Sequence, residues 1–177
     1  MSNLIVGRPQ LTEHAPYYSL YIDRIADDDI LAVLERQISE TLATINIAEE
    51  KNITDPYAPD KWSVKQLIGH LNDTERVMSY RALRFARNDK TALSGFEQDD
   101  FIPTGRFDER SFSDLKAEFE CIRRSTLSLF KHLDKEAWLR RGLANNNEIS
   151  VRALAYVMAG HVGHHMDILA TRYLNLK

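Results

Sequence analysis

Apolar residues recur with helical spacing along four long stretches of the chain. The first stretch follows the aspartates at residues 27–29, whose carboxylates suit a helix N-terminus, and its apolar positions continue through residues 30–45. The second begins at Ser63, where Gln66 three residues later completes a capping-box pattern, and it extends for about 25 residues. Both stretches therefore predict amphipathic helices with a defined start.

Two further helices are predicted in the second half of the chain. One opens near Ser111 or Ser113 and carries an apolar stripe, and the other follows Ser150 as N-cap and runs to about residue 173. No segment shows a convincing strand pattern. Four long amphipathic segments without strands predict an all-α fold, a four-helix bundle.

The remaining segments are predicted to be irregular. Residues 1–26 form an N-terminal arm with two prolines and a tyrosine cluster, which we expect to be packed against another part of the protein, with a short helical turn near its end. Residues 27–175 form the helical bundle, with a glycine- and proline-containing linker after the second helix and a polar turn before the last. The chain is thus predicted to be a single domain, residues 1–177.

Composition narrows the possible partners. The 177 residues carry a net charge of −3, so there is no electrostatic case for nucleic acid as the main partner. No apolar run reaches the ~18–20 residues of a membrane span, and the N-terminus lacks the apolar core of a signal peptide. The one cysteine, Cys121, cannot form an internal disulfide and is predicted to be a packing residue beside an apolar stripe. These features predict a cytoplasmic protein.

Three of the six histidines lie in the sequence GHVGHH, residues 160–165. His161 and His165 are four residues apart, so on a helix they emerge from one face and can bind one ion. His70 borders the apolar side of the second helix, about 10 Å from its start, and His165 lies a comparable distance from the end of the last helix. If these helices are antiparallel neighbours, the three imidazoles lie at one height and predict a metal site; ordinary hydrogen-bonded histidines at the edge of the core are the alternative.

The other three histidines are not predicted to be ligands of the metal ion. His14 lies in the arm and His132 beside a helix end, so neither is predicted as a ligand. His164 is rotated away from His161 and is predicted to lie near the site without binding the ion. A zincin mechanism is excluded, because the H-E-x-x-H motif needs a glutamate where this chain has Val162.

Several residues near the histidines allow two interpretations. Gly69, Gly160 and Gly163 cost helix stability, which indicates either tight packing or room for a ligand. Asp99, in the acidic linker sequence GFEQDDF, is either a proton-handling catalytic residue or part of a solvated loop. Asp73 either orients an imidazole or pairs with Arg76, which is three residues further along the helix.

The residues that carry these features resemble a known family. The run from YAPDKWSVKQLIGH to RFARND, then GFEQDDF and AGHVGHHMDIL, is similar to the DinB-like superfamily, also described as YfiT-like metal-dependent hydrolases. The resemblance implies a down-up-up-down four-helix bundle and one divalent metal, nickel or zinc, held by His70, His161 and His165. It departs at Val162, where close relatives often carry glutamate, and that casts doubt on any mechanism that needs the carboxylate.

The resemblance also implies a range of activities and partners. Some relatives are S-transferases that use a low-molecular-weight thiol, bacillithiol or mycothiol, and dimers are common among them. A metal held by three histidines can lower the pKa of bound water to ~7 for hydrolysis, or hold a thiol as thiolate. We therefore expect a homodimeric metal-dependent S-transferase or hydrolase that acts on a small-molecule substrate. The alternative is a non-catalytic metal- or ligand-binding module.

Overall fold

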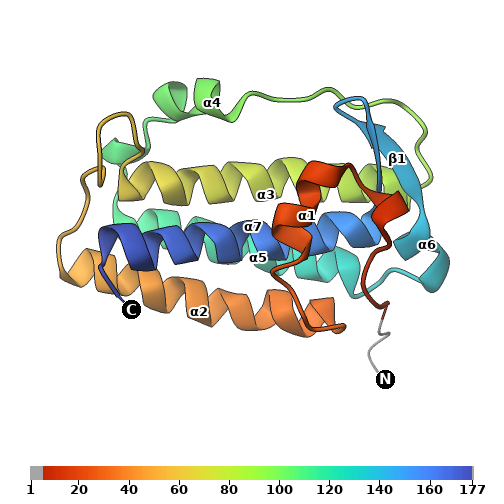
Figure 1. Ribbon diagram of the computed structural model, residues 1–177, viewed down its shortest axis with the longest axis horizontal. Helices are drawn as coiled ribbons and strands as arrows, with labels where there is room; N and C mark the ends of the chain where they lie inside the picture. Colours follow the sequence, from red (N-terminus) through yellow and green to blue (C-terminus); the bar gives the residue numbers. More distant parts are fainter. Residues whose placement is uncertain (1–5, 177) are drawn as a thin grey trace.

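The computed structural model describes residues 6–176 and shows four long helices packed side by side (Figure 1). The helices of the bundle are α2 (Ile30–Glu50), α3 (Val64–Ala86), α5 (Phe112–Phe130) and α7 (Val151–Ile168). A short π-helical segment, η4 (Leu169–Tyr173), continues α7. The predicted all-α bundle is confirmed. Within residues 6–176, no helix combines the length and apolar character needed to cross a membrane.

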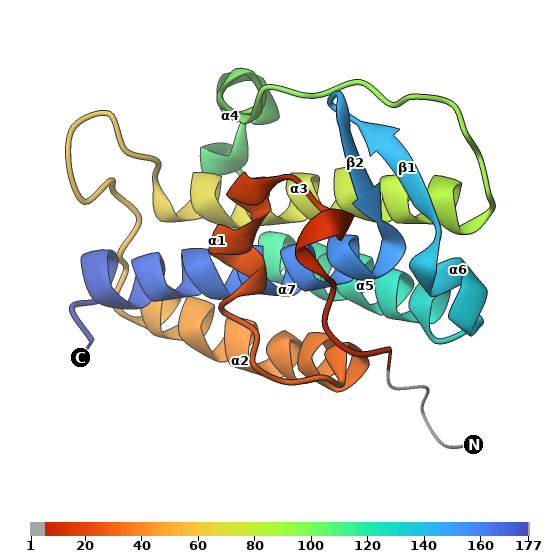
Figure 2. The same cartoon turned by 45° about the vertical axis from the view of Figure 1, so that its right-hand side comes forward.

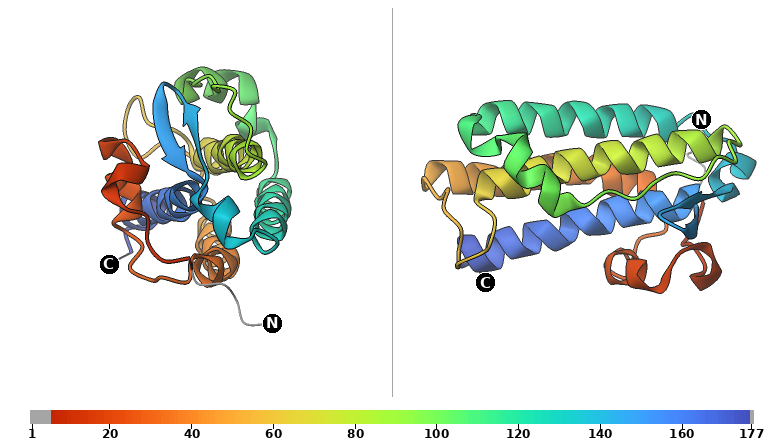
Figure 3. Two further views of the ribbon diagram at one scale, coloured as in Figure 1. Left: turned by 90° about the vertical axis from the view of Figure 1, so that its right-hand side faces the viewer. Right: turned by 90° about the horizontal axis from the view of Figure 1, so that it is seen from above.

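The order of the helices around the bundle is α2, α5, α3 and α7 (Figure 3, left). Following the colours in Figure 1, α2 and α7 run in one direction and α3 and α5 in the other, which is the down-up-up-down topology. Helices α3 and α7 are therefore antiparallel neighbours, as the position of the histidines requires. Because α3 and α5 are parallel, the chain between them must return along the whole length of the bundle.

The starts of the four helices follow the capping residues expected from the sequence. The side chains of Asp29, Ser63, Ser111 and Ser150 each accept a hydrogen bond from the backbone N–H three residues later. At Ser63 the capping box is complete, because the Gln66 side chain accepts a bond from the Ser63 N–H. These caps fix where α3 and α7 begin, and with that the heights of the histidines.

The arm lies against the outer side of α7, as Figure 3 shows in its end-on view. Its described part contains η1 (Leu11–Glu13), η2 (Pro16–Tyr18) and the single-turn helix α1 (Ser19–Ile22), which confirms a helical turn near its end; residues 1–5 of the predicted arm lie outside the described residues. Glu13 of η1 is buried and pairs with Arg152 near the start of α7. This ion pair ties the arm to the bundle.

Several elements were not expected from the sequence, among them α6 (Lys135–Leu139), a short helix between α5 and the last helix. The polar turn before α7 is a β-hairpin, β1 (Arg141–Ala144) and β2 (Asn147–Ser150), whose strands pair from Arg141↔Ser150 to Ala144↔Asn147 (Figure 2). Both turn residues, Asn145 and Asn146, have positive φ, which is what a type I′ turn requires. The absence of strands was therefore a wrong prediction.

The linker between α3 and α5 also contains more structure than predicted. It forms α4 (Gln98–Gly105) and η3 (Phe107–Glu109), although Pro103 lies inside α4 and only Ile102 of this helix is buried. Backbone hydrogen bonds from Leu93 to Leu143 and from Asn145 to Leu93 attach the linker to the hairpin. The hairpin thus holds the linker over α3 (Figure 2).

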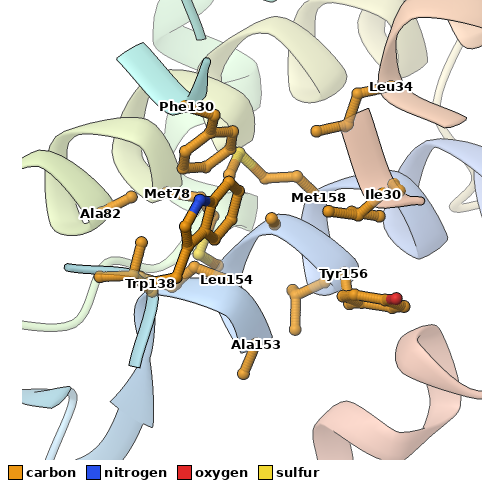
Figure 4. Packing of buried hydrophobic residues seen from close by; sticks show 14 of the residues in the cluster. Ile30, Leu34, Met78, Ala82, Phe130, Trp138, Ala153, Leu154, Tyr156 and Met158 are labelled. Atoms are coloured by element: carbon orange, nitrogen blue, oxygen red, sulfur yellow. The ribbon is translucent and has the colours of Figure 1, made fainter. Parts of the chain in front are cut away.

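The core occupies the space between the four helices. At the end near the hairpin, Phe130 and Trp138 pack beside Met78 and Met158, and Leu34 belongs to the same cluster (Figure 4). A second cluster of buried apolar side chains fills the opposite end. The predicted packing role of Cys121 is wrong, because this residue is exposed. The buried stripe of α5 passes through Phe119 and Arg123, and Cys121 points about 160° away from each of them around the helix.

Candidate metal centre

Three histidines from two helices meet inside the bundle. His70 lies in the second turn of α3, and His161 and His165 lie in the last part of α7. Because α3 and α7 are antiparallel and in contact, their imidazoles reach one height. His70 and His161 are buried and His165 is largely covered. We call these three residues the histidine cluster.

The rings of the histidine cluster face one another closely. Ring centroids are 4.8 Å apart for His70 and His161, 4.9 Å for His70 and His165, and 4.6 Å for His161 and His165. One ligand atom from each residue can be chosen so that all lie within 4.8 Å of one another. The Nε2 atoms of His70 and His161 are 2.9 Å apart. Two nitrogens bound to one ion at about 2.1 Å would be about 3.0–3.4 Å apart, so the His70 and His161 nitrogens are already near the spacing that one ion needs.

The surroundings of the cluster favour neutral imidazoles. Burial lowers the pKa of His70 to about 4. Burial, and then the neighbouring His70 and His164, lower the pKa of His165 to about 3. Burial and the nearby histidines also lower the pKa of His161 well below its ordinary value. At neutral pH the three rings are therefore uncharged, and a neutral imidazole has the free nitrogen lone pair that a metal ion needs.

Aromatic and hydroxyl groups hold these rings in place. Trp62, just before the N-cap of α3, lies with its ring 4.6 Å from His70 and is stacked 6.2 Å from His165. Tyr21 of the arm contacts His161 edge-on at 5.4 Å. The Thr74 hydroxyl lies 3.4 Å from Nδ1 of His70, on the side of the ring away from the His161 contact. Such partners orient ligand rings around metal sites.

The donor set fits a transition metal ion. The cluster consists of imidazoles alone, and imidazole suits zinc, nickel, copper and iron. Nδ1 of His165 is buried and has no hydrogen-bond partner among the described residues. A buried polar atom left unpaired costs about 1–3 kcal/mol. Three neutral donors, one of them without a hydrogen-bond partner, therefore suit a transition metal ion.

Two clefts open beside the histidine cluster. One, of about 250 Å³, reaches His161 from the side of the arm and the linker. The other, of about 270 Å³, reaches His165 beside Trp62 and Tyr173. Asp99 of α4 lines both clefts. The linker thus brings the acidic residue singled out in the sequence to the mouth of the site.

The structure places the remaining candidates outside the cluster. His14 is buried in the arm, with Nδ1 3.0 Å from the carbonyl of Ala15, and the His132 ring lies 2.7 Å from the Ser128 carbonyl. His164 contacts the His165 ring at 5.1 Å but points toward Arg24, whose Nη2 is 3.4 Å from its Nδ1.

Asp73 pairs with Arg76 at 3.7 Å. This is the pairing that the three-residue spacing allows on a helix. No described hydrogen bond joins Asp73 to an imidazole.

The helix glycines mostly serve close packing. A Cβ atom at Gly160 would lie 2.0 Å from the backbone oxygen of Tyr21, so only glycine lets the arm approach α7 here. A Cβ atom at Gly69 would overlap the ring of Phe107. At Gly163 the nearest atom would be 4.0 Å away, so that position is not crowded. Tight packing therefore explains Gly69 and Gly160, and it does not explain Gly163.

Three residues that contact the cluster, Trp62, Thr74 and Tyr21, are not among those that the sequence predicts for it. Tyr21 belonged to a tyrosine cluster without an assigned partner. The spacing of Thr74, four residues after His70, could have identified it as a hydrogen-bond partner on the same helix face. Nothing in the sequence indicates which helix the arm would contact.

A four-helix bundle with a buried three-histidine cluster defines the class of this protein. The family model described as the DinB superfamily matches residues 33–169, most of the chain. The chain therefore belongs to the DinB superfamily.

Among solved structures, the fold is similar to that of YfiT from Bacillus subtilis, described as a probable metal-dependent hydrolase with an unusual four-helix bundle topology. The TM-score is 0.76, with 16% sequence identity over 98% of this chain and 100% of that chain. At this identity the likeness shows the fold alone. No curated protein matches the chain at a comparable significance.

Proposed function

We propose that the histidine cluster binds one divalent metal ion, nickel or zinc, and that the protein is a metal-dependent S-transferase or hydrolase acting on a small molecule. The observation that carries this proposal is the meeting of three neutral imidazoles, one with an unpaired buried nitrogen, of which His161 and His165 each line a cleft. Membership of the DinB superfamily and the description of YfiT as a probable metal-dependent hydrolase support it.

An ion held by three imidazoles supplies a Lewis acid that lowers the pKa of bound water to about 7 or binds a thiol as thiolate. The chain's own residues would prepare the site for it. Thr74 fixes the orientation of His70, and Trp62 and Tyr21 cover the outer faces of the rings. Asp99, which borders both clefts, is our candidate for the group that accepts the proton lost by the water or thiol.

The two clefts favour transfer between two small molecules over simple hydrolysis. Each is large enough for a compact group, and they approach different histidines of the same cluster. A low-molecular-weight thiol in one cleft and its electrophilic acceptor in the other would meet beside the histidine cluster. In that reaction the sulfur forms a bond to the acceptor, the leaving group departs with the bonding electrons, and the thiol proton passes to Asp99.

Purified protein reloaded with nickel or zinc tests this proposal. Turnover of thiols with electrophilic acceptors, or of ester and amide panels, should require the metal and should fall strongly in Asp99→Asn. Glu109→Gln, on an exposed residue of η3 that lines neither cleft, is the matched control. Metal binding without turnover of any of these substrates would favour a non-catalytic binding module and contradict the enzymatic part of the proposal.

We also propose that the protein acts as a homodimer in the cytoplasm. The exposed aromatic and aliphatic side chains of the arm, such as Leu11, Tyr17 and Leu20, support an additional partner surface. Light scattering at micromolar concentration should give twice the monomer mass of 20.4 kDa. A monomer at that concentration would remove the dimer.

A further inference from the structure

Arg81 lies deep in the cleft that reaches His161. It is on α3, eleven residues after His70, which places it about 16 Å further along the axis and within about 20° of the same direction. Thr74 and Met78 lie between them on this face, and all three line the cleft. Arg81 is 3% exposed, so its positive charge is held inside the protein.

Two other arginines, Arg123 and Arg152, pair with buried carboxylates and so have the counter-charge that Arg81 lacks. Arg123, fully buried, donates to Glu75, and Arg152 donates to Glu13. No described carboxylate lies within salt-bridge distance of Arg81. Its Nη2 donates to the carbonyl of Ser94 at 3.0 Å, and its Nη1 lies 3.7 Å from the sulfur of Met78.

A buried charge without a counter-charge is costly, and proteins normally pair it. The guanidinium also lies over the Phe96 ring, 5.7 Å from its centroid, but its five N–H donors are more than the contacts to Ser94 and Met78 use. An incoming anion would supply both the missing charge and the missing acceptors.

The other residues that line this cleft indicate what kind of anion it could bind. Its walls are largely aromatic and apolar, formed by Tyr17, Tyr18, Tyr21, Phe96, Val157 and Met158. Two carboxylates, Glu97 and Asp99, also line the cleft, but both are exposed. The cationic end is therefore inside and the acidic end is at the rim.

We propose that Arg81 binds the carboxylate or phosphate group of a small organic anion whose apolar body lies along the aromatic wall. Guanidinium binds such oxyanions through two parallel N–H···O bonds, which fixes orientation as well as affinity. The opposite end of the molecule then points toward His161. This inference rests on the proposed function, since the anion is the substrate of that site, and it makes Arg81 a specificity-determining residue.

Binding to metal-free protein tests this inference separately from the metal site. After chelation, the protein is titrated with 3-phenylpropionate, with its neutral amide 3-phenylpropionamide and with phenyl phosphate, followed by NMR chemical shifts. The wild type should bind at least one of the two anions about tenfold or more tightly than the amide. Chelation removes any ion that could bind the carboxylate itself, so failure of the proposed metal site would leave this result unchanged.

Three variants then test whether Arg81 causes the preference for the anion. Arg81→Met should abolish the preference for the anion, and Arg81→Lys should keep part of it because the charge remains without the two-pronged geometry. Arg124→Met, at an exposed arginine of α5 outside the cleft, should behave as wild type.

Equal binding of amide and anions by the wild type would overturn the proposal, even if Arg81→Met fails to fold. So would a folded Arg81→Met that keeps the preference. Anion binding that appears only after metal is added, and that survives in Arg81→Met, would place the anion on the metal ion and overturn the proposal too.

Discussion

Two buried polar groups lie between the helices of this bundle, and they differ in how completely their atoms are paired. Around Arg123, all three guanidinium nitrogens donate hydrogen bonds: Nε and Nη2 to the Glu75 carboxylate, and Nη1 to the Leu34 carbonyl and the Gln37 side chain. Gln37 in turn donates to the Ala159 carbonyl at 2.8 Å. This network joins all four helices.

The histidine cluster is the opposite case. Its rings mainly face one another, Thr74 contacts His70 at the long distance of 3.4 Å, and Nδ1 of His165 has no described partner. A network that pairs all of its own polar atoms can stabilise the fold by itself, whereas the histidine cluster leaves ring nitrogens that a bound ion could pair. The pairing of the polar atoms therefore distinguishes the Arg123 network from the proposed metal site.

The largest effect is expected from breaking the paired network. Arg123→Met leaves the buried Glu75 carboxylate without a counter-charge, so the free energy of unfolding should fall by about 3–5 kcal/mol. Urea unfolding of the metal-free protein measures it. The double variant Arg123→Met/Glu75→Leu should recover much of the loss, because it removes the stranded charge. A loss below about 1 kcal/mol in the single variant would show that the network is not a stabilising centre.

Metal should stabilise the protein only through the histidine cluster. At a free nickel or zinc concentration 100 times the Kd, the free energy of unfolding should rise by about 2.7 kcal/mol. His161→Ala should lose this gain, and His132→Ala, on an exposed ring, should keep it. Thermal melts with and without metal provide the measurement. An equal gain in both variants would place the ion elsewhere.

Acid should break the ion pair that ties the arm to α7. Although burial alone would raise the pKa of Glu13, hydrogen bonds from Arg152 and Ser150 lower it to about 2 from the ordinary 4.5. A carboxyl group with a lowered pKa contributes stability above its unfolded pKa, and this contribution is lost as the pH falls toward the folded value. We expect the Glu13 charge to contribute about 2 kcal/mol to the free energy of unfolding at pH 7. This is less than the pKa shift alone would give, because Arg152 is partly exposed to solvent.

The comparison of wild type with Glu13→Gln isolates this contribution from other acids. The variant should be less stable at pH 7, and the difference should shrink between pH 5 and pH 2. A difference that stays constant over this range would mean that the charge of Glu13 does not hold the arm.

The smallest effect is expected from the hydroxyl that orients His70. Thr74→Val keeps the shape of the side chain and removes the contact to Nδ1, so metal affinity should fall by about tenfold. Competition with a chromogenic chelator measures the affinity. Thr126→Val, at a buried threonine of α5 that bonds only to its own helix, should leave the affinity unchanged. Equal affinities in both variants would show that Thr74 does not orient the ligand.

Local signals were enough to predict the bundle and its histidines. Asp29, Ser63 and Ser150 capped their helices as expected, since capping depends on residues within one turn. The spacing of His161 and His165 fixed one helix face, and the family resemblance supported His70. The structure brings these three together, and their binding of an ion remains a prediction.

The hairpin, helix α4 and the contacts of Tyr21 and Arg81 were not predicted, because each depends on features that hydrophobic periodicity does not reveal. The hairpin depends on two asparagines with positive φ in strands of only four residues, too short for an alternation pattern. Helix α4 buries one apolar residue, Ile102, and packs against α3, which is distant in sequence from its own turn. The contact of Tyr21 with His161 and the unpaired charge of Arg81 depend on segments far apart in sequence, so neither was visible in it.

Metal analysis of histidine variants tests the central claim most directly. The wild type and five alanine variants are stripped with a chelator, reloaded with nickel or zinc, desalted and measured for metal per chain. We predict about one ion per chain in wild type, His132→Ala and His164→Ala, and a sharp loss in His70→Ala, His161→Ala and His165→Ala. His164→Ala is the strictest control, because its ring touches His165 without belonging to the cluster. Equal metal content in all six proteins would contradict the site.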